Sequence, residues 1–213
     1  QIPRLRAAAE QGDAEAQFEL GRRHDKGDGV PENDEEAVRL YRLAADQGLA
    51  KAQSHLAGMY GRGEGVAADI AEAIRLWRTA AEQGDVDGRF WLGMMYAYGQ
   101  EPLPKDGQEA ARLLKMAIAQ GDRRAKHFLG EMYAEGLGLP QDYQEAVRWY
   151  RASAEDGFAY GQLDLAEAYR GGKGVPKDDR EAFRWYQKAA DQDEEKAQYA
   201  LGLMYQEGIG VPK

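Results

Sequence analysis

Three histidines are the side chains best suited to acid–base or metal chemistry in this sequence. They are His24, His55 and His127, and no His-Glu-x-x-His pattern or other paired spacing of metal ligands joins them. His24 and His127 stand where other parts of the chain carry aromatic residues, so we expect both to be packed or half-buried. His55 occupies a position that varies along the chain, where it can contact a partner.

Nucleophiles and phosphate-binding loops are equally scarce. The chain has no cysteine, which excludes disulfides, thiolate metal sites and thiol nucleophiles. Its aliphatic hydroxyls, Ser54, Thr79 and Ser153, have no recognisable catalytic setting. Gly-x-Gly pairs such as Gly27 and Gly29 follow predicted helices and lack a third glycine or a Gly-Lys-Ser/Thr sequence. We therefore predict no catalytic residue, no cofactor and no metal ion.

Many of the carboxylates have a structural explanation. At five places an acidic or amide residue is followed three residues later by glutamate, which is the spacing of an N-terminal capping box. An arginine stands three residues after each glutamate, where an ion pair on a helix surface contributes about 0.2–0.5 kcal/mol. The five sets are Asn33/Glu36/Arg39, Asp69/Glu72/Arg75, Asp106/Glu109/Arg112, Asp142/Glu145/Arg148 and Asp178/Glu181/Arg184.

These caps recur because the whole chain is an internal repeat. A landmark of small residues followed by an acidic or amide residue and Gly ends at positions 12, 48, 84, 121 and 157, with Asp in place of Gly at 193, so the spacings are 36, 36, 37, 36 and 36 residues. The extra residue falls in the loop 100–104.

Each period predicts a first helix, with residues such as Ala52, Leu56 and Tyr60 at i, i+4 and i+8, then a glycine-rich loop and a capped second helix. Large side chains that we expect in the core of the second helices are Leu40-Tyr41, Leu76-Trp77, Leu113-Leu114, Trp149-Tyr150 and Trp185-Tyr186.

The repeated sequence resembles a known family. The stretch 197–212, AQYALGLMYQEGIGVP, is similar to one half of a Sel1-like repeat, and 181–190, EAFRWYQKAA, is similar to the other half. The resemblance covers essentially the whole chain and implies an all-α, right-handed α/α superhelical solenoid of about five to six helix-pair repeats. We expect a single domain, 1–213, in which 1–12 ends an incomplete repeat, the repeats are 13–48, 49–84, 85–121, 122–157 and 158–193, and 194–213 begins a further repeat.

What the resemblance implies about function is a scaffold for protein–protein contact, with the first helices lining a concave groove. Bacterial members of the family are often exported or periplasmic, and some act as immunity proteins that neutralise toxins, so a periplasmic or exported location is favoured. The third repeat departs from the family because its loop 100–104 reads Gln-Glu-Pro-Leu-Pro. We expect the superhelical pitch to change there.

Comparison between repeats predicts which surface binds a partner. Positions are counted from the start of each repeat, at Asp13, Leu49, Asp85, Asp122, Phe158 and Glu194. The third, seventh, tenth and fourteenth positions vary most between repeats, and this spacing forms one helical stripe, here called the variable stripe. Large side chains gather in its middle, and an exposed aromatic patch is typical of interaction hot spots. The predicted partner-binding residues are Trp91, Met94, Tyr98, Phe128, Tyr160, His55, Asp87, Arg124 and Glu131. The alternative is that Trp91 and Phe128 fill gaps left by the 37-residue repeat.

Charge narrows the kinds of partner. Lys and Arg number 28 and Asp and Glu 37, so the net charge is 28 − 37 = −9, which argues against binding nucleic acid or anionic membranes. Apolar runs are too short to insert into a bilayer. On the variable stripe the first two repeats carry a charge of +2 and the last three carry −3. We therefore predict a non-enzymatic module, favoured as a monomer, that binds a protein or peptide in its groove; the alternative is binding of a small molecule or a cell-wall glycan.

Overall fold

The computed structural model describes residues 2–211, and every regular element among them is an α-helix. The twelve helices found in this range are α1 (Ile2–Glu10), α2 (Ala14–Lys26), α3 (Asp34–Asp46), α4 (Ala50–Arg62), α5 (Ile70–Glu82), α6 (Val86–Tyr98), α7 (Gly107–Ala119), α8 (Arg123–Glu135), α9 (Tyr143–Glu155), α10 (Ala159–Gly171), α11 (Asp179–Ala190) and α12 (Glu195–Glu207). The all-α prediction is confirmed. The even-numbered helices are the predicted first helices, and the odd-numbered ones from α3 are the second helices.

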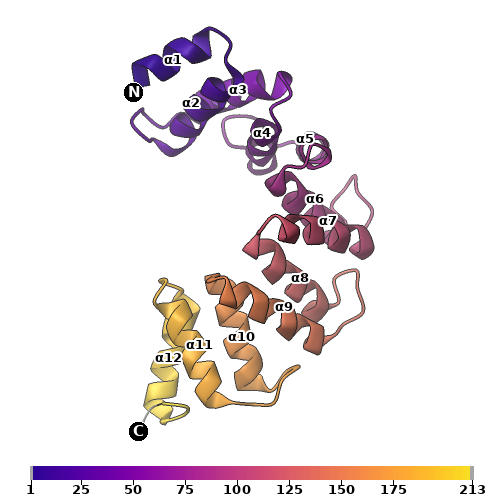
Figure 1. The fold of residues 1–213 in the computed structure, drawn as a ribbon, viewed down its shortest axis with the longest axis vertical. Coiled ribbons are helices and arrows are strands. Elements are labelled where there is room, and N and C mark those ends of the chain that lie inside the picture. The colour runs from indigo at the N-terminus through magenta and orange to yellow at the C-terminus, as the bar shows by residue number, and fades with distance from the viewer. Residues whose placement is uncertain (1, 212–213) are drawn as a thin grey trace. The chain divides into compact units, whose positions relative to one another are not determined.

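The helices form two compact units, residues 1–104 and 105–213. Within each unit, helices that follow one another in the chain pack side by side, from α1 to α6 and from α7 to α12 (Figure 1). The boundary falls at the end of the irregular loop 100–104. A single continuous domain, and the change in pitch expected at this loop, stay predictions. The predicted last repeat, 194–213, ends in residues 212 and 213, which lie outside the described residues.

The second helices begin with the predicted caps. The Asn33 side-chain oxygen accepts a hydrogen bond from the Glu36 amide at 3.0 Å, and an aspartate does the same at each of the other four starts. The capping glutamates do not turn back to complete the box. Instead, each pairs with the arginine three residues later, as Glu36 does with Arg39 at 2.7 Å, so the predicted surface ion pairs are present in all five repeats.

The glycine-rich loops join the first helix of a repeat to its second helix. The first helices end at glycines in the left-handed conformation, for example Gly172 with φ 68°, where a side chain would be strained. Two residues later, Gly174 lies against the start of the preceding second helix, so closely that a Cβ there would stand 2.0 Å from the Tyr143 carbonyl oxygen. Gly65, Gly138 and Gly210 approach the preceding second helix in the same way, so these loops help to fix the distance between one repeat and the next.

The core lies between neighbouring helices rather than at one centre. Tyr41 and Leu114 are fully buried, as predicted for the second helices, and a local cluster around Leu163, Phe183 and Met204 packs α10, α11 and α12 together. Trp149 and Trp185 are only half-buried, which differs from the prediction. Part of the reason is visible at Trp185, whose ring carries the Lys188 ammonium group 3.9 Å above its centre and so faces the surface.

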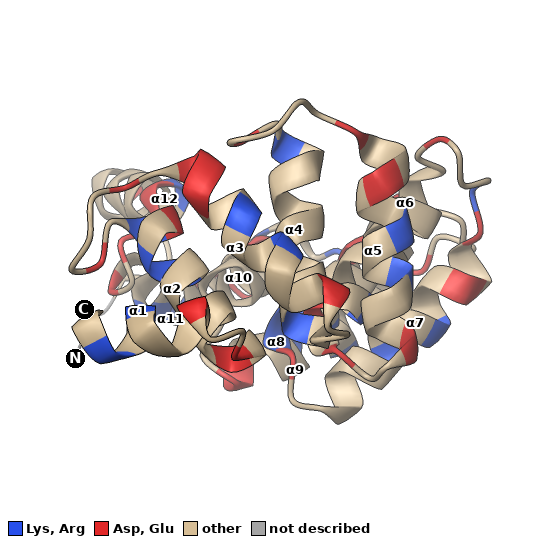
Figure 2. Cartoon of the chain, turned by 90° about the horizontal axis from the view of Figure 1, so that it is seen from above, with Lys and Arg blue, Asp and Glu red and all other residues tan. Residues whose placement is uncertain are grey.

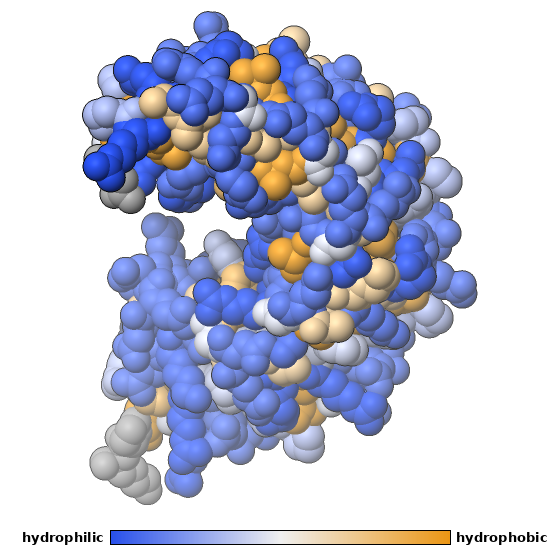
Figure 3. All heavy atoms as spheres, turned by 45° about the horizontal axis from the view of Figure 1, so that its top comes forward, coloured by the Kyte–Doolittle hydropathy of each residue, from blue (hydrophilic) through white to orange (hydrophobic). Residues whose placement is uncertain are grey.

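Charged residues of both signs are interspersed along the helices (Figure 2), and hydrophilic side chains dominate the face seen in Figure 3. Among the described residues, no helix has both the length and the apolar character needed to cross a membrane.

Candidate protein-binding surface

The variable stripe is largely accessible, but not at every position. Its fourteenth position is exposed in all six first helices, and its third position is exposed or half-buried in all six. Its seventh position is the most enclosed, and no residue there is fully exposed. The seventh residue thus reaches toward the neighbouring helices, while the other positions of the stripe face outward.

The aromatic part of the stripe in the first unit lies on α6. Tyr98 is 54% exposed, whereas Trp91 and Met94 are half-buried. The Trp91 ring stacks on the buried Trp77 ring with their centres 5.8 Å apart and an angle of 20° between their planes. Trp91 therefore packs one face against the scaffold and keeps an accessible part, so it has features of both interpretations.

Phe128, on α8 of the second unit, does not lie at the surface. It is only 3% exposed, so the prediction that it contributes to an exposed patch is wrong, and its burial agrees with the core alternative. The adjacent His127 keeps a side-chain exposure of 14% at a position where Phe18 and Phe90 are buried. The cause is the relative cost of burial, because enclosing an apolar phenyl ring is favourable and enclosing an imidazole is not.

Three further predicted residues have contacts within the chain. His55 is half-buried against the Phe18 ring, with centres 5.0 Å apart, and its Nδ1 lies 2.9 Å from the Lys51 carbonyl oxygen. Arg124 pairs at 2.7 Å with Asp122, a buried carboxylate that caps α8. Asp87 is half-buried. Whether these residues also bind a partner stays a prediction.

In the second unit, the stripe of α8 and α10 borders an open hollow of about 630 Å³. Four carboxylates line it: Glu131, Glu135, Asp164 and Glu167. Tyr143, Val147 and Tyr150 form part of its wall, and Arg170 and Lys173 add positive charge. The acidic bias that the sequence predicts for the later repeats is thus gathered in one concavity, here called the acidic hollow.

Burial and like charge shape the electrostatics of the acidic hollow. Burial raises the pKa of Glu131, with nearby Asp164 adding to the effect and His127 opposing it. Burial likewise raises the pKa of Glu167, again with a contribution from Asp164. The Tyr150 side chain is 8% exposed, and its hydroxyl makes no hydrogen bond within the described part of the chain. Burial and four carboxylates raise the pKa of this tyrosine, so its hydroxyl keeps its proton.

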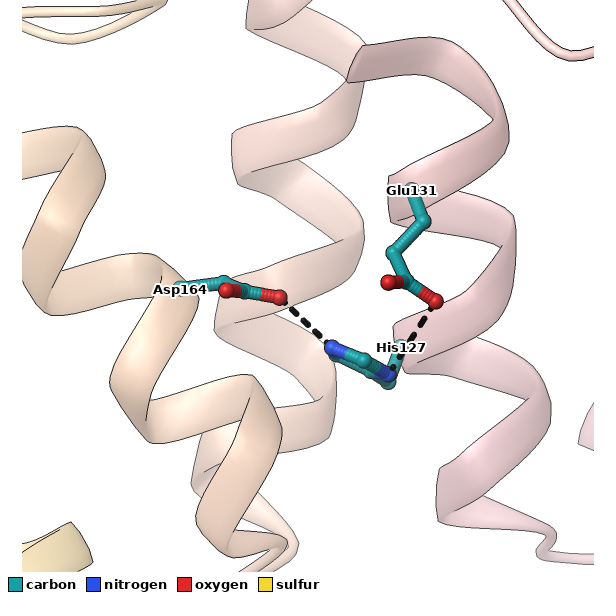
Figure 4. A group of neighbouring side chains, drawn as sticks. All are labelled: His127, Glu131 and Asp164. Carbon is teal, nitrogen blue, oxygen red and sulfur yellow. Dashed lines mark hydrogen bonds and ion pairs between the residues drawn. The ribbon is translucent and has the colours of Figure 1, made fainter. Parts of the chain in front are cut away.

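His127 stands between two of these carboxylates (Figure 4). Its Nε2 lies 2.6 Å from Oδ2 of Asp164 on α10, and its Nδ1 lies 3.7 Å from Oε2 of Glu131, one turn further along α8. The half-buried environment predicted for His127 is confirmed, but the cluster was missed. Asp164 comes 37 residues after His127, so no local spacing links them.

Tyr160 lies beside this cluster. It is 53% exposed, and its ring contacts those of Phe158 and His127, with centres 5.4 and 6.1 Å away. The predicted surface residues of the second unit thus fall into two groups. Glu131 lines the acidic hollow and Tyr160 contacts the His127 ring, whereas Phe128 belongs to the core.

Helix pairs that repeat every 36 or 37 residues and pack on their chain neighbours define a helical repeat solenoid. The model of the Sel1 repeat matches residues 14–49, 50–85, 86–122, 123–158, 159–194 and 195–213, and the chain belongs to the Sel1 repeat family. Each matched repeat starts one residue after the predicted start. Sel1 repeats generally mediate contacts between proteins.

Solved structures agree with this assignment. A Sel1 repeat protein from Oxalobacter formigenes is 36% identical, with a TM-score of 0.84 over 92% of this chain and 79% of that chain. The protein c5321, a protective antigen present in uropathogenic Escherichia coli strains, is 37% identical, with a TM-score of 0.81 over 97% of this chain. This chain spans only 44% of c5321.

More distant structures share only the fold. The immunity protein Pa5087 from Pseudomonas aeruginosa is 22% identical, with a TM-score of 0.59 over 86% of this chain and 67% of that chain. Comparison of the sequence with curated proteins gives no match.

Proposed function

We propose that the chain is a non-enzymatic interaction module that binds a protein or peptide partner through the variable stripe. The observation that carries this proposal is the exposure of aromatic side chains at positions that differ between repeats. Tyr98 and Tyr160 are 54% and 53% exposed and supply contact area at little cost in side-chain entropy. The framework positions, by contrast, are needed to hold neighbouring helices together.

The two units favour different partner chemistry. On α6 the stripe has three large side chains, Trp91, Met94 and Tyr98, beside the carboxylate of Asp87, which suits a partner that presents mainly apolar side chains. In the second unit the acidic hollow suits basic groups. In either unit, the charges of the partner would set its orientation more than its affinity.

A narrower version of this function is an immunity protein that covers a partner enzyme. The immunity proteins among the similar structures are too distant to support more than a shared fold. An immunity role, and a periplasmic or exported location, therefore stay predictions from the family resemblance.

The alternative function is binding of a glycan. Tyr160 beside the acidic hollow favours it, because an exposed aromatic ring can stack on a sugar and carboxylates can accept hydrogen bonds from its hydroxyls. A shift in melting temperature with cell-wall fragments, without a stoichiometric protein partner, would support this alternative.

The test is capture of partners from an extract of the source organism by the purified chain. We expect one stoichiometric protein, with capture reduced at least tenfold in Tyr98→Ala and Tyr160→Ala and little change in melting temperature. Tyr199→Ala is the matched control, because Tyr199 is 71% exposed but lies outside the variable stripe. If the stripe variants capture as much partner as the control variant does, the proposed surface is wrong.

A further inference from the structure

We propose that His127, Glu131 and Asp164 bind a divalent transition-metal ion, with Zn²⁺ favoured, between α8 and α10. One ligand atom from each of the three side chains lies within 4.8 Å of the other two. An imidazole nitrogen with two carboxylate oxygens is a ligand set that suits Zn²⁺ and its first-row neighbours. This site shares Glu131 and the acidic hollow with the proposed partner surface, but binding of an ion does not require a partner and so goes beyond the proposed function.

The geometry requires only side-chain adjustment. Zinc bonds to His nitrogen and carboxylate oxygen are about 2.0–2.2 Å long, so two ligands of one tetrahedral ion lie about 3.3 Å apart. An ion at Nε2 of His127 would replace the proton now shared with Asp164, and that 2.6 Å contact would open by less than about 1 Å. Glu131 comes from the same helix as His127, one turn away, and can rotate its flexible side chain toward the ion (Figure 4).

The surroundings favour a dication. Glu135 and Glu167 join Glu131 and Asp164 in the acidic hollow, and the cations that line it, Arg170 and Lys173, are fewer than its carboxylates. A divalent ion would offset this excess of negative charge.

A second observation points to a polar ligand in the same place. The Tyr150 side chain is more than nine-tenths buried and lines the acidic hollow, yet its hydroxyl has no hydrogen-bond partner among the described residues. The ring is enclosed, and the hydroxyl is the part of this side chain that reaches the open hollow. Water bound to the ion is a candidate for that partner, and the open hollow provides the entry path.

Comparison with the first unit shows that the repeat does not need this cluster for folding. The residues 109 positions earlier are Phe18 for His127, Tyr41 for Tyr150 and His55 for Asp164. Those three rings pack together, with centres 5.0 to 5.6 Å apart. The Tyr41 hydroxyl donates to Asp25 at 3.1 Å, so this equivalent of Tyr150 is satisfied. The fourth and fifth repeats therefore replace an aromatic contact with potential metal ligands.

Three protein ligands leave a coordination position open toward the acidic hollow. Structural zinc sites are filled by four protein ligands, whereas open sites exchange water for another ligand. The ion would therefore join α8 to α10 and also present a position that an external group can occupy.

The test is isothermal titration of Zn²⁺ into the full chain, without a polyhistidine tag and after removal of metal with EDTA. We expect saturable binding of one ion per chain, weakened at least tenfold by His127→Gln and by Asp164→Asn. Glu135→Gln removes an equal charge from the same hollow without removing a ligand, and we expect its affinity to stay within about threefold of the unmodified chain. Melting curves without metal check that each variant is folded.

Histidine NMR supplies a readout that does not depend on affinity. We expect Zn²⁺ to shift the ring-nitrogen resonances of His127 and to leave those of His24 unchanged. If His127→Gln fails to fold, Glu131→Gln replaces it, because it leaves the His127–Asp164 hydrogen bond intact. Absence of saturable binding would overturn the proposal, as would binding that the ligand variants do not weaken or that Glu135→Gln weakens equally.

Discussion

At the residue scale, Phe128 on α8 is more enclosed, and the adjacent His127 less enclosed, than most residues at the same positions of other repeats. Phe128 occupies a position of the variable stripe but is 3% exposed, and His127 occupies an aromatic framework position but remains accessible. The sequence predicts which positions form the stripe because helical spacing fixes their direction. It does not predict how far Phe128 and His127 are enclosed, because that depends on the side chains that neighbouring helices place against them.

Phe128→Ala tests its assignment to the core. We expect the variant to lose about 3–5 kcal/mol of unfolding free energy, because it creates a cavity among packed side chains. Tyr160→Ala, at a position that is 53% exposed, should change stability by less than about 1 kcal/mol. Urea denaturation of both variants measures the difference in unfolding free energy. Equal stability of the two variants would show that Phe128 is not part of the core.

Glu167 gives a prediction about pH. Its folded-state pKa is raised above the ordinary value of 4.5 by burial and by Asp164, with Lys196, Lys173 and Arg170 opposing the shift. Its ionised form is therefore unfavourable in the folded chain. Glu167→Gln should raise the melting temperature at pH 7, and this gain should disappear below pH 4.5, where the carboxyl is neutral in both states.

The expected gain is small, about 1–2 °C, because the Glu167 side chain still reaches solvent and its interactions are screened. Glu82→Gln, an exposed carboxylate on α5, is the control and should show no such dependence on pH. A gain for Glu167→Gln that grew as the pH fell would contradict the assignment.

At the scale of the element, the loops between first and second helices set the spacing of the repeats. The sequence predicts these loops well, since glycine, proline and the capping residues act on the backbone within a few residues. Less visible from sequence is the contact each loop makes with the preceding second helix. That contact joins residues about 31 positions apart, such as Gly174 and Tyr143.

Gly174→Ala tests this contact. The substitution adds a Cβ 2.0 Å from the Tyr143 carbonyl oxygen and imposes a positive φ of 70° on alanine, so we expect a loss of about 2–4 kcal/mol. The control is Gly48→Ala, with φ 87° and nothing within 4 Å of the added atom, which should lose only about 1–2 kcal/mol. Thermal unfolding measures both, and equal losses would mean that backbone strain alone is responsible.

At the scale of the whole molecule, stability is distributed over a series of local contacts. The repeat period, the order of the helices and the family could all be predicted from sequence because each follows from a pattern that occurs several times. The division into two units and the cluster around His127 could not be predicted. Both depend on how helices from different repeats meet, and a single sequence carries no pattern for that.

Leu20→Ala tests whether stability is local. Leu20 packs with Ala9, Ala16 and Leu40 in a cluster confined to α1, α2 and α3. We expect a loss of about 2–5 kcal/mol, measured as faster amide hydrogen exchange in these helices. Exchange in residues 105–213 should be unchanged, because that unit has cores of its own. A uniform increase across the chain would show that it opens as one cooperative body.

Equivalent polar pairs differ between repeats, and this difference matters when repeats are recombined into a chimera. Gln17 and Gln47 are hydrogen-bonded in the first repeat, and their counterparts 109 residues later are Lys126 and Asp156, joined by a 2.5 Å ion pair. Both members of each pair lie in one repeat, so a repeat transplanted into another protein keeps its own hydrogen bond or ion pair. His127 and Asp164 belong to different repeats, so a chimera that moves only one of them would separate the histidine from its carboxylate.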